Sequence, residues 1–195
     1  MNCPDCRSTD TEHIIRSADE MFVPSEMRPG GLFAWVKRCW ECGKNESGYT
    51  TLAFRPVTID DAQLLFDWRT DPETVANSYS DGPSSFEAHA AWMTHMLRPL
   101  QQPGPSFLNQ LAIQWLIGCI GTEPVGVIRV HLFSYPPELH TTVAPQWRGR
   151  GIGTAMLALA PVHAKTIGRV KGTNGASLIS FEKAGWTLGE VVYVK

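Results

Sequence analysis

The sequence predicts a mixed α+β (α/β) protein in which helices flank a central β-sheet, preceded by a small domain with a four-cysteine zinc site. Segments with strand and helix patterns alternate from Leu52 onward, and a glycine-rich loop, QWRGRGIGT over 146–154, joins a strand to a helix. Two Cys-x-x-Cys pairs precede this region. We therefore expect a zinc-ribbon domain over 1–50 and a larger domain over 51–195.

The composition is that of a folded protein without a nucleic-acid target. The 195 residues are 43% hydrophobic, and 17 Lys and Arg against 19 Asp and Glu give a net charge of −2. Nucleic-acid binding depends on clustered basic residues that neutralise phosphates, so this balance argues against DNA or RNA as a partner. The sequence has neither a signal-peptide pattern nor an apolar run long enough to cross a membrane, and we expect a cytoplasmic protein.

Four of the five cysteines form two pairs with the spacing of a metal site, Cys3 with Cys6 and Cys39 with Cys42. Two intervening residues let both thiolates of a pair turn toward one tetrahedral Zn²⁺. Because four thiolates leave no coordination position open, we expect a structural zinc that helps a small segment to fold. The alternative, a pair of disulfides, is disfavoured in the cytosol. The fifth cysteine, Cys119, lies in an apolar strand-like run and is expected in the core.

A strand and two helices are expected after the small domain. LAFRPV, which begins at Leu52, has strand-forming residues. Thr58 and the acids after it are suited to starting a helix, which the Asp71–Pro72 sequence ends. A second helix is expected over about 85–97, where apolar and aromatic residues recur at helical spacing: Phe86, His89, Trp92, Met93 and Met96.

Three further strands are expected around the glycine-rich loop. LAIQWLIGCI and VGVIRVHLF, separated by Gly-Thr-Glu-Pro over 121–124, have the pattern of a hairpin. A third strand over 138–143 leads into the loop. A short helix that stops at Pro161 and a strand near 166–171 are expected after the loop.

The loop has the properties of a pyrophosphate-binding site. Arg148, Gly151 and Gly153 give the spacing Arg-x-x-Gly-x-Gly, and an apolar helical run follows at once. Glycines let backbone N–H groups approach phosphate oxygens, the helix N-terminus favours the anion, and Arg148 and Arg150 add charged donors. The loop lacks the ending of a nucleotide P-loop and the acidic residue of a dinucleotide site, which favours coenzyme A. The alternative is a tight strand-to-helix turn without a ligand.

Four segments together resemble the GNAT acetyltransferase superfamily over about residues 52–186. They are RPVTIDDAQLLFDWRTDP, PVGVIRV, VAPQWRGRGIGT and NGASLISFEKAGW. The resemblance implies a sheet splayed between two parallel strands, about 138–143 and 165–171, with the pantetheine arm of acetyl-CoA between them. The family's cofactor loop falls on Arg148, Gly151 and Gly153, and its later motif falls on Asn174, Ser177, Phe181, Gly185 and Trp186.

The resemblance implies an acetyl-CoA-dependent N-acetyltransferase in which an amine attacks the thioester directly, with no covalent enzyme intermediate. Where many members carry a tyrosine that protonates the leaving thiolate, this chain has Phe181, which cannot donate a proton. The adjacent Ser180 points elsewhere on its helix. Water or an unidentified residue would then supply that proton. The residues expected to contact acetyl-CoA are Val143, Arg148, Gly149, Arg150, Gly151, Gly153, Thr154, Asn174 and Phe181.

Glu138 and His140 are the candidate general bases. They share one face of a strand by period-two geometry, and the family often directs a carboxylate from this position toward the amine. His140 has a side chain that titrates near neutral pH. For each, the alternative is an ordinary strand residue.

The acceptor is expected to be a small amine. FDWRTDP, SYS and EAHAAW resemble enzymes that acetylate nucleotide-linked amino sugars in pseudaminic and legionaminic acid synthesis, with Trp68, Arg69, His89 and Trp92 in that pattern. His89 and Trp92 share a helix face, and packing on the sheet is their alternative role. Other acceptors stay open: a protein N-terminus, a lysine or an aminoglycoside. So do a homodimer, a protein partner of the zinc ribbon, and an acyl-CoA-binding protein without turnover.

Overall fold

The computed structural model describes residues 11–17, 32–39, 45–97, 113–132, 134–162 and 165–189, with only the backbone described before residue 51. The strands in this part of the chain form one sheet in chain order, antiparallel except for its last pair. They are β1 (Thr11–Ser17), β2 (Leu32–Cys39), β3 (Asn45–Pro56), β4 (Ile113–Ile120), β5 (Glu123–His131), β6 (Glu138–Val143) and β7 (Ile167–Gly168).

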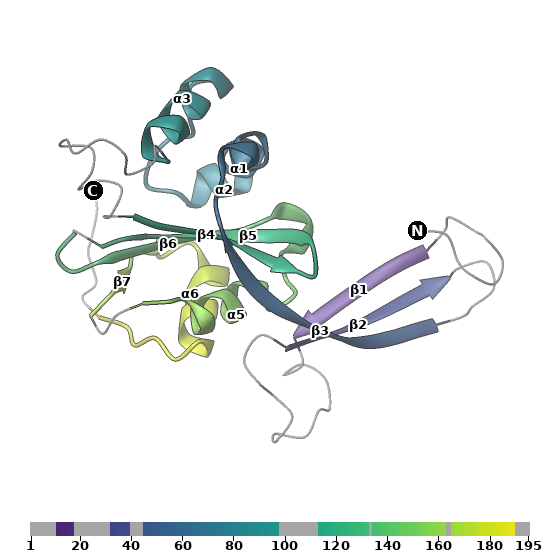
Figure 1. The fold of residues 1–195 in the computed structure, drawn as a ribbon. Coiled ribbons are helices and arrows are strands. Elements are labelled where there is room, and N and C mark those ends of the chain that lie inside the picture. Colours follow the sequence, from purple (N-terminus) through teal and green to yellow (C-terminus); the bar gives the residue numbers. More distant parts are fainter. Residues whose placement is uncertain are drawn as a thin grey trace.

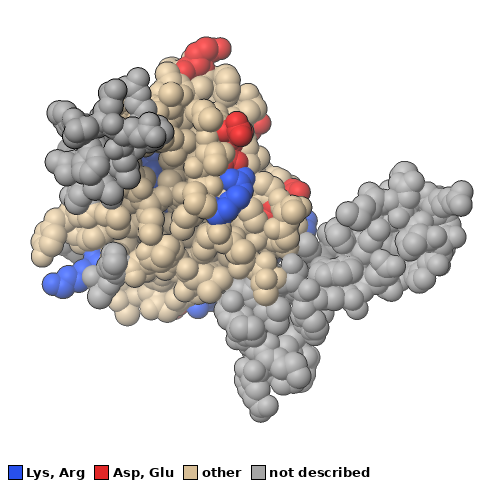
Figure 2. Space-filling view, viewed as in Figure 1, with Lys and Arg blue, Asp and Glu red and all other residues tan. Residues whose placement is uncertain are grey.

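Helices cover both faces of the sheet (Figure 1). One face carries η3 (Ile59–Asp61), α1 (Ala62–Thr70), α2 (Pro72–Asn77) and α3 (Phe86–Met96), whereas the other carries α5 (Ile152–Leu159) and α6 (Gly175–Lys183). The short η4 (Pro145–Trp147) follows β6. Within the described residues, no helix has the length and apolar character needed to span a bilayer. Lys and Arg side chains do not gather into a continuous patch on the described part of the face in Figure 2.

The strand β3 joins the N-terminal hairpin to the main sheet. Its first half pairs with β2, up to Thr51 opposite Leu32, and its second half pairs with β4, from Leu52 opposite Ile120. Figure 1 shows β1 and β2 extending from the helix-covered body along this strand. The strand therefore runs without interruption through the domain boundary expected near residue 50.

Side-chain caps start η3, which leads into α1, and α2. The Asp61 carboxylate accepts a hydrogen bond from the Thr58 N–H at 2.8 Å and forms a bidentate ion pair with Arg55 at 2.6 and 2.8 Å. The Asp71–Pro72 sequence ends α1 as expected, but it also begins α2, because the Asp71 carboxylate accepts from the Thr74 N–H and proline suits the first helical position. The sequence analysis did not predict this extra helix.

Two apolar clusters hold the helices to the sheet. Beneath α5, Ile128 and Ile152 are fully buried or nearly so, together with Met156. On the other face, Met93 of α3 and Trp68 of α1 pack over β4. Cys119 belongs to this second cluster as a buried free thiol, as expected from its apolar run. The two helical layers are therefore fixed independently on either side of one sheet.

The sheet opens between β6 and β7. Only two residues of each strand pair, Glu138 with Ile167 and Leu139 with Gly168, so β7 is shorter than the strand expected near 166–171. On its other edge, β6 stays paired with β5 as far as Val143. The backbone of β6 after Leu139 therefore has one edge that no described strand covers.

Candidate active site

The glycine-rich loop connects the end of β6 to α5 beside this opening. The Ala144 N–H donates to the Val125 carbonyl and so fixes the end of β6. Gly149 and Gly151 have φ angles of 71° and 76°, in the left-handed region that glycine adopts without a steric cost. A Cβ on Gly153 would lie 3.4 Å from the side chains of both Val143 and Ser180. The first turn of α5 therefore lies against the C-terminal end of β6.

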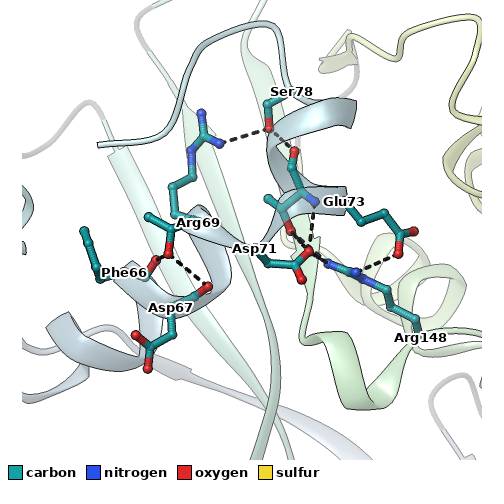
Figure 3. Close-up of polar contacts among 9 residues, drawn as sticks. Phe66, Asp67, Arg69, Asp71, Glu73, Ser78 and Arg148 are labelled. Carbon is teal, nitrogen blue, oxygen red and sulfur yellow. Dashed lines mark hydrogen bonds and ion pairs between the residues drawn. The ribbon is translucent and has the colours of Figure 1, made fainter. Parts of the chain in front are cut away.

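The structure gives the Arg148 guanidinium partners on α2 (Figure 3). Its Nη2 lies 2.5 Å from Asp71 Oδ2 and donates to Thr74 Oγ1 at 2.9 Å, and its Nη1 lies 2.8 Å from Glu73 Oε2. Burial of the Asp71 carboxyl opposes its ionisation, but the hydrogen bonds from Arg148 and Thr74 outweigh this and lower its pKa. The expected contact between this guanidinium and a pyrophosphate therefore competes with two ion pairs. Arg150 lies with its Cζ 5.1 Å from the centre of the Trp147 ring.

The side chains of Asn174 and Phe181, in the segment NGASLISFEKAGW, make contacts within the protein. Asn174 caps α6 by accepting from the Ser177 N–H at 3.1 Å. The Phe181 ring covers Gly168 of β7, where a Cβ would come within 2.4 Å, and packs edge-on against Trp186 at 5.0 Å. The Phe181 ring thus contacts Gly168 and Trp186, and its expected apolar contact with the cofactor stays a prediction. Ser180, which the sequence analysis set aside, is the neighbour that faces Gly153.

Glu138 and His140 lie close together on the face of β6 toward α1 and α3. Glu138 Oε1 is 3.7 Å from His140 Nε2, and Glu138 Oε2 is 3.5 Å from Arg169 Nε. Burial, reinforced by the charge of Arg129, lowers the pKa of His140 to about 4. The same two causes lower the pKa of His131, whose ring is 5.2 Å from that of His140, to about 4. Both imidazoles are therefore neutral at neutral pH.

The four residues expected to bind the acetyl acceptor differ in exposure and in their contacts with the protein. Trp68 is 4% exposed and His89 is 7% exposed, so both pack in the layer under α1 and α3, and packing was the alternative role of His89. The Arg69 guanidinium donates hydrogen bonds to residues at the end of α2 and in the loop after it. They go to the Ser78 hydroxyl at 3.2 Å, shown in Figure 3, and to the Ser80 hydroxyl at 2.8 Å. Trp92 is 37% exposed and alone among the four presents a substantial surface.

Two residues that the sequence analysis missed complete this face. Trp115 on β4 pairs in register with Arg129 on β5, which pairs in register with His140 on β6. Trp92 lies over both, 5.2 Å from the Trp115 ring and 5.6 Å from the Arg129 guanidinium carbon. No local motif marks Arg129. An arginine at an inward position of a strand, where an apolar residue is expected, was the signal available in the sequence.

A splayed sheet with a left-handed glycine loop and a helix beside the opening defines the class of protein: an acetyltransferase fold. The chain belongs to the acetyltransferase (GNAT) domain family, whose model matches residues 51–187. This confirms the family expected from the sequence motifs. The chain is accordingly an acyltransferase of the N-acetyltransferase kind.

Solved structures share the fold at low sequence identity. Spermidine N-acetyltransferase from Vibrio cholerae, in complex with CoA and spermine, has a TM-score of 0.56 and 13% identity over 69% of this chain and 79% of that chain. An aminoglycoside acetyltransferase in complex with coenzyme A and kanamycin has a TM-score of 0.53 and 17% identity over 69% and 83%. A domain from Methanocaldococcus jannaschii has a TM-score of 0.55 and 21% identity over 70% and 88%. No curated protein sequence matches the chain.

Proposed function

We propose that this protein transfers the acetyl group of acetyl-CoA to a primary amine of a small molecule, by direct attack in a ternary complex. The observation that carries the proposal is the uncovered edge of β6 beside the glycine-rich loop. Backbone N–H and C=O groups on such an edge can pair with the amide groups of a pantetheine arm as a strand would. The thioester would then lie beside the half of β6 that ends at Val143.

The backbone of the loop is the proposed pyrophosphate site. The left-handed glycines Gly149 and Gly151 turn the chain so that it enters α5, whose first N–H groups have no partner within the helix. Gly153 and Thr154 lie in that first turn. Since the Arg148 side chain is engaged with α2, we assign it the positioning of the loop, and Arg150 supplies a further positive charge.

The amine would be deprotonated on the face of β6 that holds Glu138 and His140. A neutral imidazole has a free lone pair, and the carboxylate 3.7 Å away favours the imidazolium that forms when it takes a proton. A base with a pKa of about 4 is weak, so His140 alone is a poor base, and Glu138 on the same face, directly or through a water, stays the other candidate. Phe181 supplies no proton to the departing thiolate.

Turnover with a panel of amines tests this function. Binding of acetyl-CoA is measured by calorimetry, and thiol release is followed with kanamycin, spermidine, a peptide with a free N-terminus, glucosamine and a nucleotide-linked amino sugar. We expect binding, and thiol release with at least one small amine. Binding without release from any amine would instead favour a non-catalytic acyl-CoA-binding protein. Release limited to the peptide would identify a protein N-acetyltransferase.

We also propose that the N-terminal segment is a separate zinc-ribbon domain over 1–50. The antiparallel register sets Thr11 at the start of β1 opposite Cys39 at the end of β2. In the sequence one cysteine pair precedes β1, and Cys39 of the other pair is the last residue of β2. Cys3, Cys6 and Cys42 lie outside the described residues. The Cys-x-x-Cys spacing of both pairs, with Cys39 opposite Thr11 at the start of β1, supports a four-thiolate site.

Metal analysis of the purified protein tests the zinc site. We expect one zinc per chain, lost in Cys39→Ser, because each thiolate is one of four ligands. Cys119→Ser is the matched control, since Cys119 is a buried free thiol of the main sheet. A full zinc content in Cys39→Ser, or none in the wild-type chain, would refute the proposal.

A further inference from the structure

The Arg129 guanidinium is a partly buried cation with no counter-ion among the described residues. Its Nε–H is fully buried and donates no hydrogen bond, and Arg129 forms no ion pair with any residue in the described part of the chain. Burial lowers its pKa, which is the direction expected for a charge removed from water without compensation. Buried polar groups in native proteins are nearly always paired, and an unpaired one calls for an explanation such as a bound ligand.

The surroundings of Arg129 add positive charge rather than neutralise it. Arg69 on α1 is near enough to lower the pKa of Arg129 further, and it acts in the same direction on His89 and His140. Glu138 is the carboxylate that acts on Arg129 in the opposite direction, but its oxygens lie 3.7 Å from His140 and 3.5 Å from Arg169. The face between α3 and β6 is therefore electropositive.

Aromatic rings lie beside the Arg129 guanidinium. Trp92 lies over the guanidinium with its ring centre 5.6 Å away, and Trp115 occupies the paired position on β4. A cation–π contact attracts the guanidinium but supplies no hydrogen-bond acceptor. His89 Nε2, buried beside Trp92, also has no hydrogen-bond partner among the residues that the structure describes. Two hydrogen-bonding groups thus stay unsatisfied around one exposed indole.

We propose that the acetyl acceptor carries an anionic group, a carboxylate or a phosphate, which pairs with Arg129 beneath Trp92 while the amine of the same molecule lies at Glu138 and His140. This inference rests on the proposed acetyl transfer. Arg129 and His140 are direct neighbours across β5 and β6, so one small molecule can reach both. A guanidinium binds either anion with charge-assisted, bidentate hydrogen bonds. An acceptor with several positive charges would be repelled by Arg69 and Arg129 together.

Matched acceptors that differ only in the anionic group test the proposal and identify the anion. Glucosamine 6-phosphate is compared with glucosamine, and serine with serinamide, by thiol release in the wild-type enzyme and in Arg129→Gln. We expect the anionic member of one pair to be the better substrate.

The KM for this anionic acceptor should rise by roughly 30-fold or more in Arg129→Gln, because one side of a buried charge pair is lost. The KM for the neutral acceptor should change little in Arg129→Gln, and Arg129→Lys should recover part of the lost affinity for the anionic one. Spermidine or kanamycin as the preferred acceptor would overturn the proposal, as would an equal effect on both members of each pair.

Direct binding separates this inference from the proposed reaction. If acetyl-CoA binds but no amine is acetylated, the acetyl-transfer proposal fails, whereas calorimetric binding of glucosamine 6-phosphate or serine to the CoA complex still tests the anion site. We expect this binding to weaken in Arg129→Gln and to be unchanged in Lys183→Gln, a control that removes one positive charge from α6. Equal affinity of wild type and Arg129→Gln, or no affinity of the wild type for either anion, would overturn the inference.

The stability of the ligand-free protein distinguishes a ligand-binding arginine from a structural one. Replacing an uncompensated buried charge by an uncharged side chain is neutral or stabilising, so Arg129→Gln should leave the Tm unchanged or raise it. A structural arginine would give the opposite result. A Tm lowered by several degrees in Arg129→Gln would show that Arg129 supports the fold and would refute the anion site.

Discussion

At the scale of single residues, the sequence motif identified Arg148 but not the atoms that its side chain contacts. Asp71 and Glu73 lie 77 and 75 positions away along the chain, so no local pattern connects them to the loop. The ion pairs join the glycine-rich loop after β6 to the α2 region on the face of the sheet that carries α1 and α3. Arg148 can therefore affect coenzyme A binding through the position of the loop.

A comparison of Arg148→Ala with Asp71→Asn tests this role. Asn retains the N-cap of α2 but loses the ion pair, and a hydrogen bond to a charged group contributes about 1.5–3 kcal/mol. We expect the KM for acetyl-CoA to rise by about tenfold or more in each variant, with no further rise in the double variant. If the guanidinium binds phosphate itself, Asp71→Asn should release it and leave the KM unchanged or lower. Glu73→Gln is the control, because its exposed ion pair should contribute little.

At the scale of elements, the opening of the sheet depends on how α6 packs on β7. The Phe181 ring occupies the position above Gly168, where any side chain would collide with it. The two residues of β7 therefore pair with β6 beneath an aromatic ring. Phe181, for which the sequence resemblance implies a contact with the cofactor, therefore also packs against the core as a partly buried side chain.

Gly168→Ala should destabilise the protein, because its Cβ would lie 2.4 Å from the Phe181 ring. Overpacking of this kind costs about 1–3 kcal/mol, which corresponds to a fall in Tm of roughly 2–4 °C per kcal/mol for a chain of this length. Thermal unfolding measures the effect. Gly172→Ala is the matched control, since nothing lies within 4 Å of its Cβ position. Phe181→Ala should remove the sensitivity to alanine at Gly168, and an unchanged Tm in Gly168→Ala would contradict this packing.

At the scale of the whole molecule, neutral histidines on one face of the sheet link stability to pH. Burial lowers the pKa of His131 and of His140 from 6.5 to about 4. Unfolding restores the higher pKa, so between these values the unfolded chain binds more protons than the folded one. The stability contributed by the neutral imidazoles is therefore complete above pH 6.5 and is lost as the pH falls toward 4.

The Tm should fall as the pH is lowered from about 7 to about 5, and the fall should be smaller in His131→Gln and in His140→Gln. Carboxylates such as Asp61 and Asp71 do not explain a change in this window, because their pKa values are lowered from 3.8 and they titrate at more acidic pH. Differential scanning calorimetry at several pH values provides the measurement. A Tm that is flat over this window, or one that falls as much in both variants as in the wild type, would contradict the linkage.

Local patterns predicted the course of the chain from β3 to α6 to within a few residues. The cap at Thr58, the end of α1 before Asp71, the period-two pattern of β6 and the turn before β5 each depend on neighbours a few positions apart, so the sequence shows them directly. The short α2 was missed because a proline after a capping aspartate ends one helix and begins another with the same two residues.

The sequence alone determined the family and the place of the glycine-rich loop, because both depend on residues that lie close together along the chain. Only the tertiary structure decided that Arg148 holds α2, that Phe181 covers Gly168, and that Arg129 lies uncompensated between Trp92 and His140. Strand register and helix packing bring these groups together from distant parts of the chain. The charge balance around the proposed acceptor site is therefore a property of the folded sheet, which no local segment of the sequence contains.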